Sequence, residues 1–196
     1  MHGFLLFNVK FPIYTFIIWF MEIKDYKPFK VKLNDISYKY SFINHERKIA
    51  RAILFDDEGY FYFVNVTRND EFGKCSLIET SGGGVKRNET YRKALKRELK
   101  EELGAEVKII CYLGEVIDFY NLIHRKNLNH YFLCKVNNFK ENNLTNDEIN
   151  KFHLKTLKVK YDEAIDLYKK YMFTKLGRLL YNREMIPLLA IKDFKK

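Results

Sequence analysis

The sequence is poor in cysteine, proline and glycine, and each scarcity excludes a class of protein. Its three cysteines, Cys75, Cys111 and Cys134, are widely spaced and form no CxxC pair, so we expect neither a disulfide framework nor a zinc site. All three lie in apolar stretches, as buried thiols of a cytoplasmic protein do. Only three prolines and nine glycines interrupt the 196 residues, and no repeat or Pro/Ser-rich linker divides the chain. The length therefore fits one domain with a short extension.

The sequence carries more positive than negative charge, but its lysines and arginines do not gather in one segment. The formal net charge is +10, yet no run of lysine and arginine is longer than two residues. Binding of nucleic acid or of an anionic membrane relies on a concentrated positive field. We therefore expect neither as a partner, and we interpret the charge as an attraction for small phosphorylated anions. The apolar content of 47% and the charged content of 31% are ordinary for a globular protein.

The chain begins with an apolar stretch that needs its own interpretation. From Phe4 to Phe20 the residues are mostly apolar, but the stretch is short for a membrane span of about 20 residues and contains an asparagine, a lysine and a proline. Met21 begins a segment that resembles a natural protein start. Three interpretations stay open: a wrongly chosen start codon, an extra packed or swapped element, and a membrane anchor. We expect residues 1–20 to be an extension and residues 21–196 to be the functional domain.

Residue patterns further along predict both strands and helices. Short runs of apolar, aromatic and β-branched residues indicate strands, and leucines spaced four apart from Leu95 to Leu103 indicate a helix packed on a sheet. Strands before and after one central helix, with helices at the end, predict an α+β sandwich. Strands are expected at 48–55, 60–66, 76–79, 107–118, 130–136 and 152–159, helices at 89–103, 162–172 and 183–194, and a polar loop at 141–150.

One segment has a pattern that chemistry explains better than packing does. A loop of three glycines, Gly82, Gly83 and Gly84, precedes a helix that carries Glu98, Glu101 and Glu102. The spacing i, i+3, i+4 places the three carboxylates on one helix face, where like charges destabilise an isolated helix. A hard divalent cation such as Mg²⁺ would neutralise them, and a glycine carbonyl can join the coordination. A merely solvated charged face leaves the fixed distance from the glycines to the acids unexplained.

This segment resembles the signature of the Nudix hydrolases. The family pattern is Gly, five residues, Glu, seven residues, and then Arg-Glu-aliphatic-x-Glu-Glu-x-Gly-aliphatic. Three positions depart from common usage, at Lys86, Asn88 and Ala105, and none of them is a ligand position. The flanking pattern extends the resemblance over roughly residues 48–194, which implies a Nudix-like α/β/α sandwich with a mixed central sheet. In this chain the signature reads Gly83, Glu89 and Arg97-Glu98-Leu99-Lys100-Glu101-Glu102-Leu103-Gly104.

The resemblance implies a metal-dependent hydrolase. Glu98, Glu101 and Glu102, with the carbonyl of Gly83, are the implied ligands of Mg²⁺, for which Mn²⁺ is a possible substitute. Arg97 is implied to orient the neighbouring carboxylates. In this mechanism a water, activated by the metal or by a carboxylate, attacks phosphorus.

The general base and the substrate contacts are less well defined. Some family members use a helix glutamate as the base and others use an acid from a distant loop, where this chain has Glu148. The glycines Gly82 to Gly84 are expected to approach the substrate. Tyr120 is a further candidate for substrate binding: we favour a core or pocket-wall position over a base-stacking role, although family members often stack the nucleobase on an aromatic ring.

The signature specifies the chemistry and leaves the substrate open. ADP-ribose, nucleotide sugars, dinucleoside polyphosphates and nucleoside triphosphates all stay possible small-molecule substrates. Two alternatives are a catalytically silent nucleotide sensor and an RNA-directed enzyme. The stretch 24–42 is expected either to add a strand to the domain or to pair with a second subunit in a homodimer.

Overall fold

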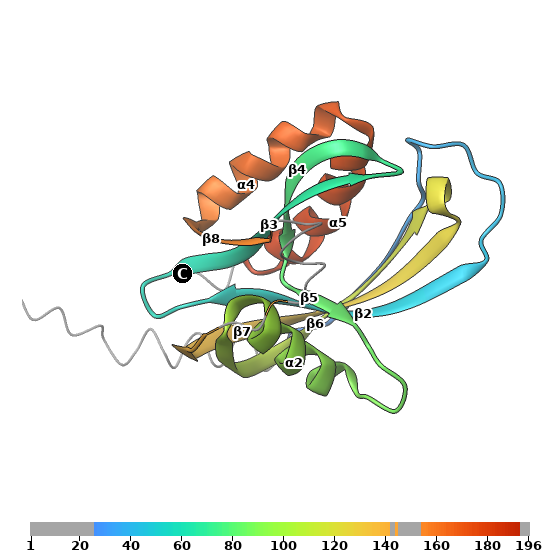
Figure 1. Cartoon of the computed structure of the whole chain (residues 1–196). Helices are drawn as coiled ribbons and strands as arrows, with labels where there is room; N and C mark the ends of the chain where they lie inside the picture. Colours follow the sequence, from blue (N-terminus) through green and yellow to red (C-terminus); the bar gives the residue numbers. More distant parts are fainter. Residues whose placement is uncertain (1–25, 142–143, 145–153, 193–196) are drawn as a thin grey trace, which may run out of the picture.

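A mixed sheet forms the centre of the computed structural model, which describes residues 26–141, 144 and 154–192. The sheet has eight strands in the order β1-β6-β7-β2-β3-β4, with β5 paired to β2 and β8 paired to β3. Figure 1 shows how it curves between the helices. The strands are β1 (Phe29–Leu33), β2 (His45–Phe55), β3 (Tyr60–Asp70), β4 (Gly73–Thr80), β5 (Gly82–Gly84), β6 (Ala105–Tyr120), β7 (Arg125–Phe139) and β8 (Lys155–Lys160). The helices are α2 (Tyr91–Leu103), α4 (Tyr161–Lys170) and α5 (Lys175–Ala190), with short 3-10 turns at Asn121–Ile123 and Tyr171–Phe173.

Helices cover both faces of the sheet (Figure 1). Leu95 and Leu99 of α2 are fully buried against one face, in a cluster that includes Ala52 of β2. Tyr168 of α4 and Leu188 of α5 are fully buried against the other face. Because apolar strips must be covered on both sides of such a sheet, three layers result, and the predicted α+β class with a mixed central sheet is confirmed.

Helix α2 begins at Tyr91, two residues later than the predicted start at Glu89. Thr90 is its N-cap and accepts a hydrogen bond from the backbone N–H of Lys93 at 3.3 Å, which satisfies one of the unpaired N–H groups of the first turn. Asn88 adopts φ of 63°, a left-handed conformation that asparagine tolerates better than most residues. The chain therefore turns at Asn88 and starts the helix only after Thr90.

The predicted elements are mostly present, with different bounds. The segment 24–42 contains β1, which pairs in parallel with β6 of the same chain, from Phe29↔Gly114 to Leu33↔Asp118. Helix α5 starts at Lys175 and not at Arg183, because Thr174 caps it through the N–H of Gly177 at 3.1 Å. All three cysteines are free thiols.

Several predictions fall on other parts of the chain. Within the described part of the chain, no helix is long and apolar enough to cross a membrane. The extension 1–20 lies outside the described residues, so its separation from a domain 21–196 stays a prediction. Most of the expected loop 141–150 and the first two residues of the strand expected at 152–159 also lie outside them.

Candidate active site

The three glycines of β5 bring the backbone directly against the helix carboxylates. Strand β5 pairs antiparallel with β2, with Gly83 opposite Ala50. A Cβ on Gly82, whose φ is 138°, would lie 2.1 Å from the carbonyl oxygen of Ala50, and a Cβ on Gly83 would lie 2.5 Å from the carboxyl carbon of Glu98. Only glycine fits at position 82, whereas a side chain at position 83 would displace the Glu98 carboxylate. The backbone at Gly83 thus forms a close-fitting cradle for the Glu98 carboxylate.

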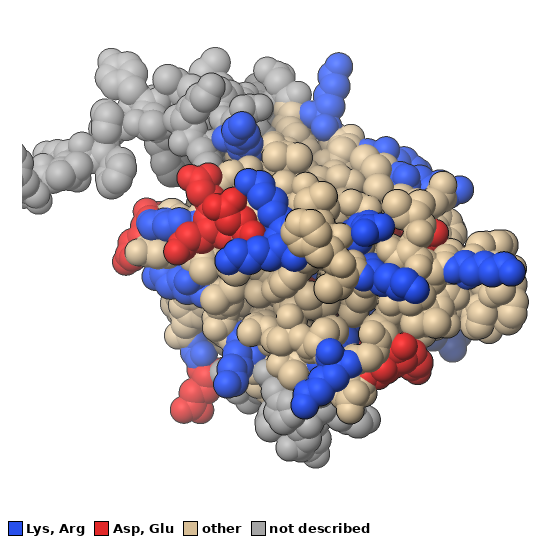
Figure 2. Space-filling model, turned by 90° about the horizontal axis from the view of Figure 1, so that it is seen from above, with Lys and Arg blue, Asp and Glu red and all other residues tan. Residues whose placement is uncertain are grey.

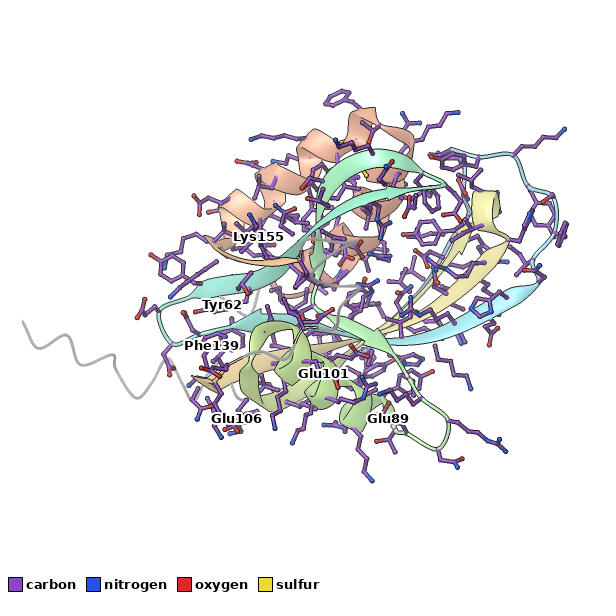
Figure 3. The ribbon with its side chains drawn as sticks, in the orientation of Figure 1. Tyr62, Glu89, Glu101, Glu106, Phe139 and Lys155 are labelled. Carbon is purple, nitrogen blue, oxygen red and sulfur yellow. The ribbon has the colours of Figure 1, made fainter. Side chains whose placement is uncertain are left out.

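Arg97 connects the other acids of the signature, and we call Arg97 with Glu89, Glu98 and Glu101 the helix ionic cluster. The Arg97 guanidinium donates to both carboxylate oxygens of Glu89, at 3.0 and 2.9 Å. It also donates to Glu98 at 2.7 Å, to Glu101 at 3.1 Å and to the carbonyl oxygen of Gly84 at 3.0 Å. Its hydrogen bond lowers the pKa of Glu89 to about 2. Figure 3 labels Glu89 and Glu101, which come from the loop before α2 and from α2 itself. These contacts fit the orienting role predicted for Arg97.

Glu102 lies on the inner side of α2 and is only 7% exposed. It accepts a hydrogen bond from the backbone N–H of Gly82 at 2.9 Å and another from the Ser81 hydroxyl. Ser81 is completely buried, so it fixes the Glu102 side chain from below. The sequence contained no signal for Ser81, because a serine before a glycine loop is ordinary in a turn.

The donor chemistry of this region suits a hard divalent cation. Glu98 and Glu102 are one helical turn apart, and Gly83 adjoins Glu98, so the available ligand atoms are all oxygens, as such an ion prefers. The side chains of Glu98 and Glu101 are turned to Arg97, and among the described residues no group of three His, Cys, Asp or Glu is close enough together to hold an ion. The residues present fit a cation by their chemistry.

A cleft opens beside the glycine loop, with a volume of about 190 Å³. Glu102, Gly82 and Gly83 line one side of it. The remaining polar lining is dominated by cations, Arg47, Arg51 and Arg68, with the single further carboxylate of Glu79. The cleft thus joins the signature carboxylates to a positively charged surface.

The floor of the cleft belongs to a second set of ion pairs, which we call the buried ionic cluster: Arg51, Arg183, Glu79 and Glu184. Glu79 accepts from Arg51 at 3.5 Å and from Arg183 at 3.2 Å, and Arg183 contacts Glu184 at 2.5 Å. The side chains of Arg183 and Glu184 are 1% and 0% exposed. Burial alone raises the pKa of Glu79, but the nearby guanidinium groups, Arg183 foremost, outweigh it and lower that pKa to about 2.

The structure places one further predicted site residue, Tyr120, elsewhere and does not describe another, Glu148. Tyr120 is 4% exposed, packs edge-on against Phe72, and its hydroxyl accepts a hydrogen bond from Arg183 at 2.9 Å. It is not among the residues that line the cleft, so the structure places it in the core and not in a pocket wall. Glu148 lies outside the described residues, and its role stays a prediction.

Comparisons with known proteins agree with this geometry. A family model described as NUDIX domain matches residues 45–173, which is more than half of the chain. No curated protein matches.

Three solved structures have a similar fold. A NUDIX hydrolase from Nitrosomonas europaea is 14% identical, with a TM-score of 0.55 over 76% of this chain and 87% of that one. A MutT protein from Methanosarcina mazei Go1 is 16% identical, with a TM-score of 0.54 over 80% of this chain and 100% of that one. A UDP-X diphosphatase is 14% identical, with a TM-score of 0.51 over 82% of this chain and 68% of that one. At these identities the likeness shows the fold alone.

The chain belongs to the Nudix family, as the family model, the fold and the arrangement around the glycine loop show together. The comparisons support a hydrolase within that family.

Proposed function

We propose that this protein hydrolyses the diphosphate linkage of a small nucleotide substrate, with Mg²⁺ bound at the α2 carboxylates and a nucleoside monophosphate or equivalent phosphate as a product. The observation that carries the proposal is the position of Glu98 beside Gly83 and of Glu102 beside Gly82, with Glu102 at the edge of a cationic cleft. A purely structural helix has no need for these acids on its inner side.

In this proposal each residue of the site has a role of its own. Glu98 and Glu102, with Glu101 and the carbonyl of Gly83, would hold the ion. When bound, Mg²⁺ polarises the phosphoryl oxygens and lowers the pKa of an attached water. Arg97 holds Glu98 and Glu101 in a fixed direction through its short contacts, as residues behind metal ligands do.

Ser81 and the arginines complete the proposed assignment. Ser81 and the N–H of Gly82 orient the Glu102 carboxylate, because both donate a hydrogen bond to it. The arginine-lined side of the cleft attracts the anionic substrate. The general base is either a helix glutamate or Glu148.

The names of similar proteins support the class without choosing a substrate. A UDP-X diphosphatase and a MutT protein share this fold, so both nucleotide–sugar linkages and nucleotides of other kinds belong in a substrate panel. The RNA-directed alternative is less well supported. On the face seen in Figure 2, lysines and arginines are separated by uncharged surface, whereas an RNA site is expected to have a contiguous basic patch.

The test is product analysis with the wild type, Glu102→Gln and Glu106→Gln, in the presence of Mg²⁺. Glu106 is a matched control, because it is an exposed carboxylate that pairs with Lys140 at 2.6 Å and does not line the cleft. We expect the wild type and Glu106→Gln to release phosphate products and Glu102→Gln to lose activity on the order of 10³-fold. Full activity of Glu102→Gln would refute the ligand role of Glu102. Nucleotide binding without any cleavage by the wild type would favour the sensor alternative.

Glu148→Gln tests the choice of general base separately. A fall in kcat with unchanged Mg²⁺ affinity would assign the base to Glu148. Unchanged kcat would assign it to a glutamate of α2.

A further inference from the structure

A row of polar side chains continues the cleft along one face of the sheet. Strands β2 and β7 are parallel, with His45↔Arg125 and Arg47↔Asn127 in register. Residues two apart on a strand face the same way, and so do register partners on neighbouring strands. Arg47, Asn127 and Arg125 therefore lie on one sheet face, the face that also carries Arg51. We call these three residues the β2–β7 polar row.

The row begins beside the glycine loop. A Cβ on Gly84 would lie 3.4 Å from the Arg47 guanidinium, just as one on Gly83 would meet the carboxylate of Glu98. Arg47 is also a lining residue of the cleft. Arg47, the first residue of the row, thus lies next to the glycine loop that adjoins the proposed metal ligands.

Within the described residues Arg47 and Arg125 form no close ion pair, unlike the other arginines nearby, although carboxylates farther away act on both of them, those of Glu98, Glu79 and Glu102 on Arg47 and that of Asp118 on Arg125. Arg51, Arg68 and Arg183 each have a carboxylate within 4.0 Å. Among the described residues, no ion pair of Arg47 or Arg125 is found within that distance, and the Arg125 guanidinium instead lies 5.2 Å from the centre of the Tyr120 ring.

Asn127, the uncharged residue of the row, also lacks hydrogen-bond partners for its side chain among the described residues. Asn127 is completely buried, and within the described part of the chain neither atom of its side-chain amide has a hydrogen-bond partner. The Nε atom of Arg125 is buried without a partner as well. Buried polar atoms are seldom left unpaired, because each costs about 1–3 kcal/mol. Such atoms in a row beside a cleft indicate a ligand that completes the arrangement.

Electrostatics indicate the sign of that ligand. Loss of hydration in the cleft and the neighbouring charge of Arg51 both lower the pKa of Arg47. Loss of hydration likewise lowers the pKa of Arg125, with the charge of Arg47 contributing. The like charges repel one another, and the more distant carboxylates offset this only in part, because the pKa of both arginines is still lowered. An anion placed between the two guanidinium groups relieves the repulsion.

We propose that the β2–β7 polar row binds a phosphate group of the substrate beyond the diphosphate that is cleaved, so that the preferred substrates carry three or more linked phosphates. The planar guanidinium forks of Arg47 and Arg125 match phosphate oxygens in a bidentate manner. The amide N–H of Asn127, which has no partner among the described residues, is a further donor beside Arg47. This inference rests on the proposed function and selects nucleoside triphosphates and dinucleoside polyphosphates over ADP-ribose and nucleotide sugars.

The experiment compares substrates that share adenosine: ADP-ribose, ATP and diadenosine tetraphosphate. We expect the wild type to have a kcat/KM at least tenfold higher for the polyphosphates than for ADP-ribose. Arg47→Ala is expected to lower that ratio at least tenfold, mainly through KM. Arg47→Lys, which keeps the charge and loses the fork, is expected to restore part of it. Arg92→Ala is the control, because Arg92 lies on the other flank of α2 and its guanidinium is 5.7 Å from the Phe132 ring.

The outcomes separate this inference from the proposed function. Cleavage of ADP-ribose in preference to the polyphosphates, lost in Glu102→Gln, would overturn the polar-row inference and leave the proposed function standing. An equal loss for all substrates in Arg47→Ala would also overturn it. Failure of the wild type to cleave any of the three or a UDP-sugar would overturn both.

Discussion

The helix ionic cluster and the buried ionic cluster differ in how far their side chains are enclosed by the protein. In the helix ionic cluster, Arg97 is 21% exposed and Glu101 is 34% exposed. In the buried ionic cluster, Arg183 and Glu184 are almost completely enclosed. An exposed ion pair contributes little to stability, so its members are free to change partners. A buried pair is hard to break, because a charge left alone in the interior is very unfavourable. The comparison suggests that the first cluster serves the reaction and the second supports the cleft floor.

The largest effect is expected from Arg183→Met, which breaks the buried ionic cluster. Removing this guanidinium leaves Glu184 without its contact at 2.5 Å and removes one partner of Glu79. We expect the free energy of unfolding to fall by about 3–5 kcal/mol. Urea unfolding followed by circular dichroism measures the change. A fall below about 1 kcal/mol would mean that the cluster does not support the fold.

A smaller effect, of a different kind, is expected from Arg97→Met. This substitution releases the carboxylates of the helix ionic cluster, so we expect kcat to fall about 10–100-fold with little change in the midpoint of thermal unfolding. Mg²⁺ titrations of activity, with Arg92→Met as the control, measure it. If stability falls and kcat does not, the contrast between the two clusters is wrong.

Low pH tests the difference between the two clusters, because the carboxyl groups of Glu79 and Glu89 both have a pKa of about 2 but belong to different clusters. A folded pKa below the usual 4.5 means that the ionised carboxylate stabilises the fold above pH 4.5. That stabilisation is lost as the pH falls from about 4.5 to about 2. The Glu79 and Glu89 side chains are equally exposed, at 14% each, but Arg97, the partner of Glu89, is 21% exposed and Arg183, the partner of Glu79, is 1% exposed. The Glu89 pair is therefore more strongly screened, and its contribution is smaller.

Unfolding free energies at pH 6 and pH 3 test this difference. Glu79→Gln is expected to lose clearly less stability between these values than the wild type does, whereas Glu89→Gln is expected to follow the wild type. The same flattening in both variants would show that burial does not distinguish the two acids.

The smallest effect is expected at the helix caps. Thr90→Ala and Thr174→Ala each remove one N-cap hydrogen bond, at 3.3 Å in α2 and 3.1 Å in α5, for a loss of about 1 kcal/mol. Only α2 carries the signature carboxylates, so only Thr90→Ala is expected to change the KM for Mg²⁺. A change of that KM in Thr174→Ala would show that α5 also acts on the site.

The signature was readable from the sequence because its spacing is local. Gly83, Glu89 and Arg97 meet through one turn and one helix, whose geometry depends on few other residues. The buried ionic cluster was not readable, since Arg51, Glu79 and Arg183 come together only through the tertiary fold. Charged residues in a strand or helix normally face solvent, and nothing in the sequence marked these as exceptions.

The start of helix α5 and the position of the Tyr120 side chain were also not predictable from local sequence patterns. Helix α5 was predicted only in its second half, because Gly177 weakens the helical pattern near its start. Tyr120 is the last residue of β6, and contacts with residues far away in the sequence decide which face of that strand is buried. The sequence therefore left the position of the Tyr120 side chain open.

The parallel pairing of β2 with β7 has a consequence for the order in which the protein forms. Arg47 and Asn127 are register partners although the ribosome makes them some seconds apart, at about 5–20 residues per second. Strand β2 has Arg47 and Arg51 on one face and Ala50 and Ala52 on the other. Its parallel pairing can form only after β7 has been synthesised. The glycine loop and α2 can form early from local contacts, whereas the arginine side of the cleft can form only late in synthesis. Nascent chains stopped before β7 should therefore contain the signature helix without a finished cleft.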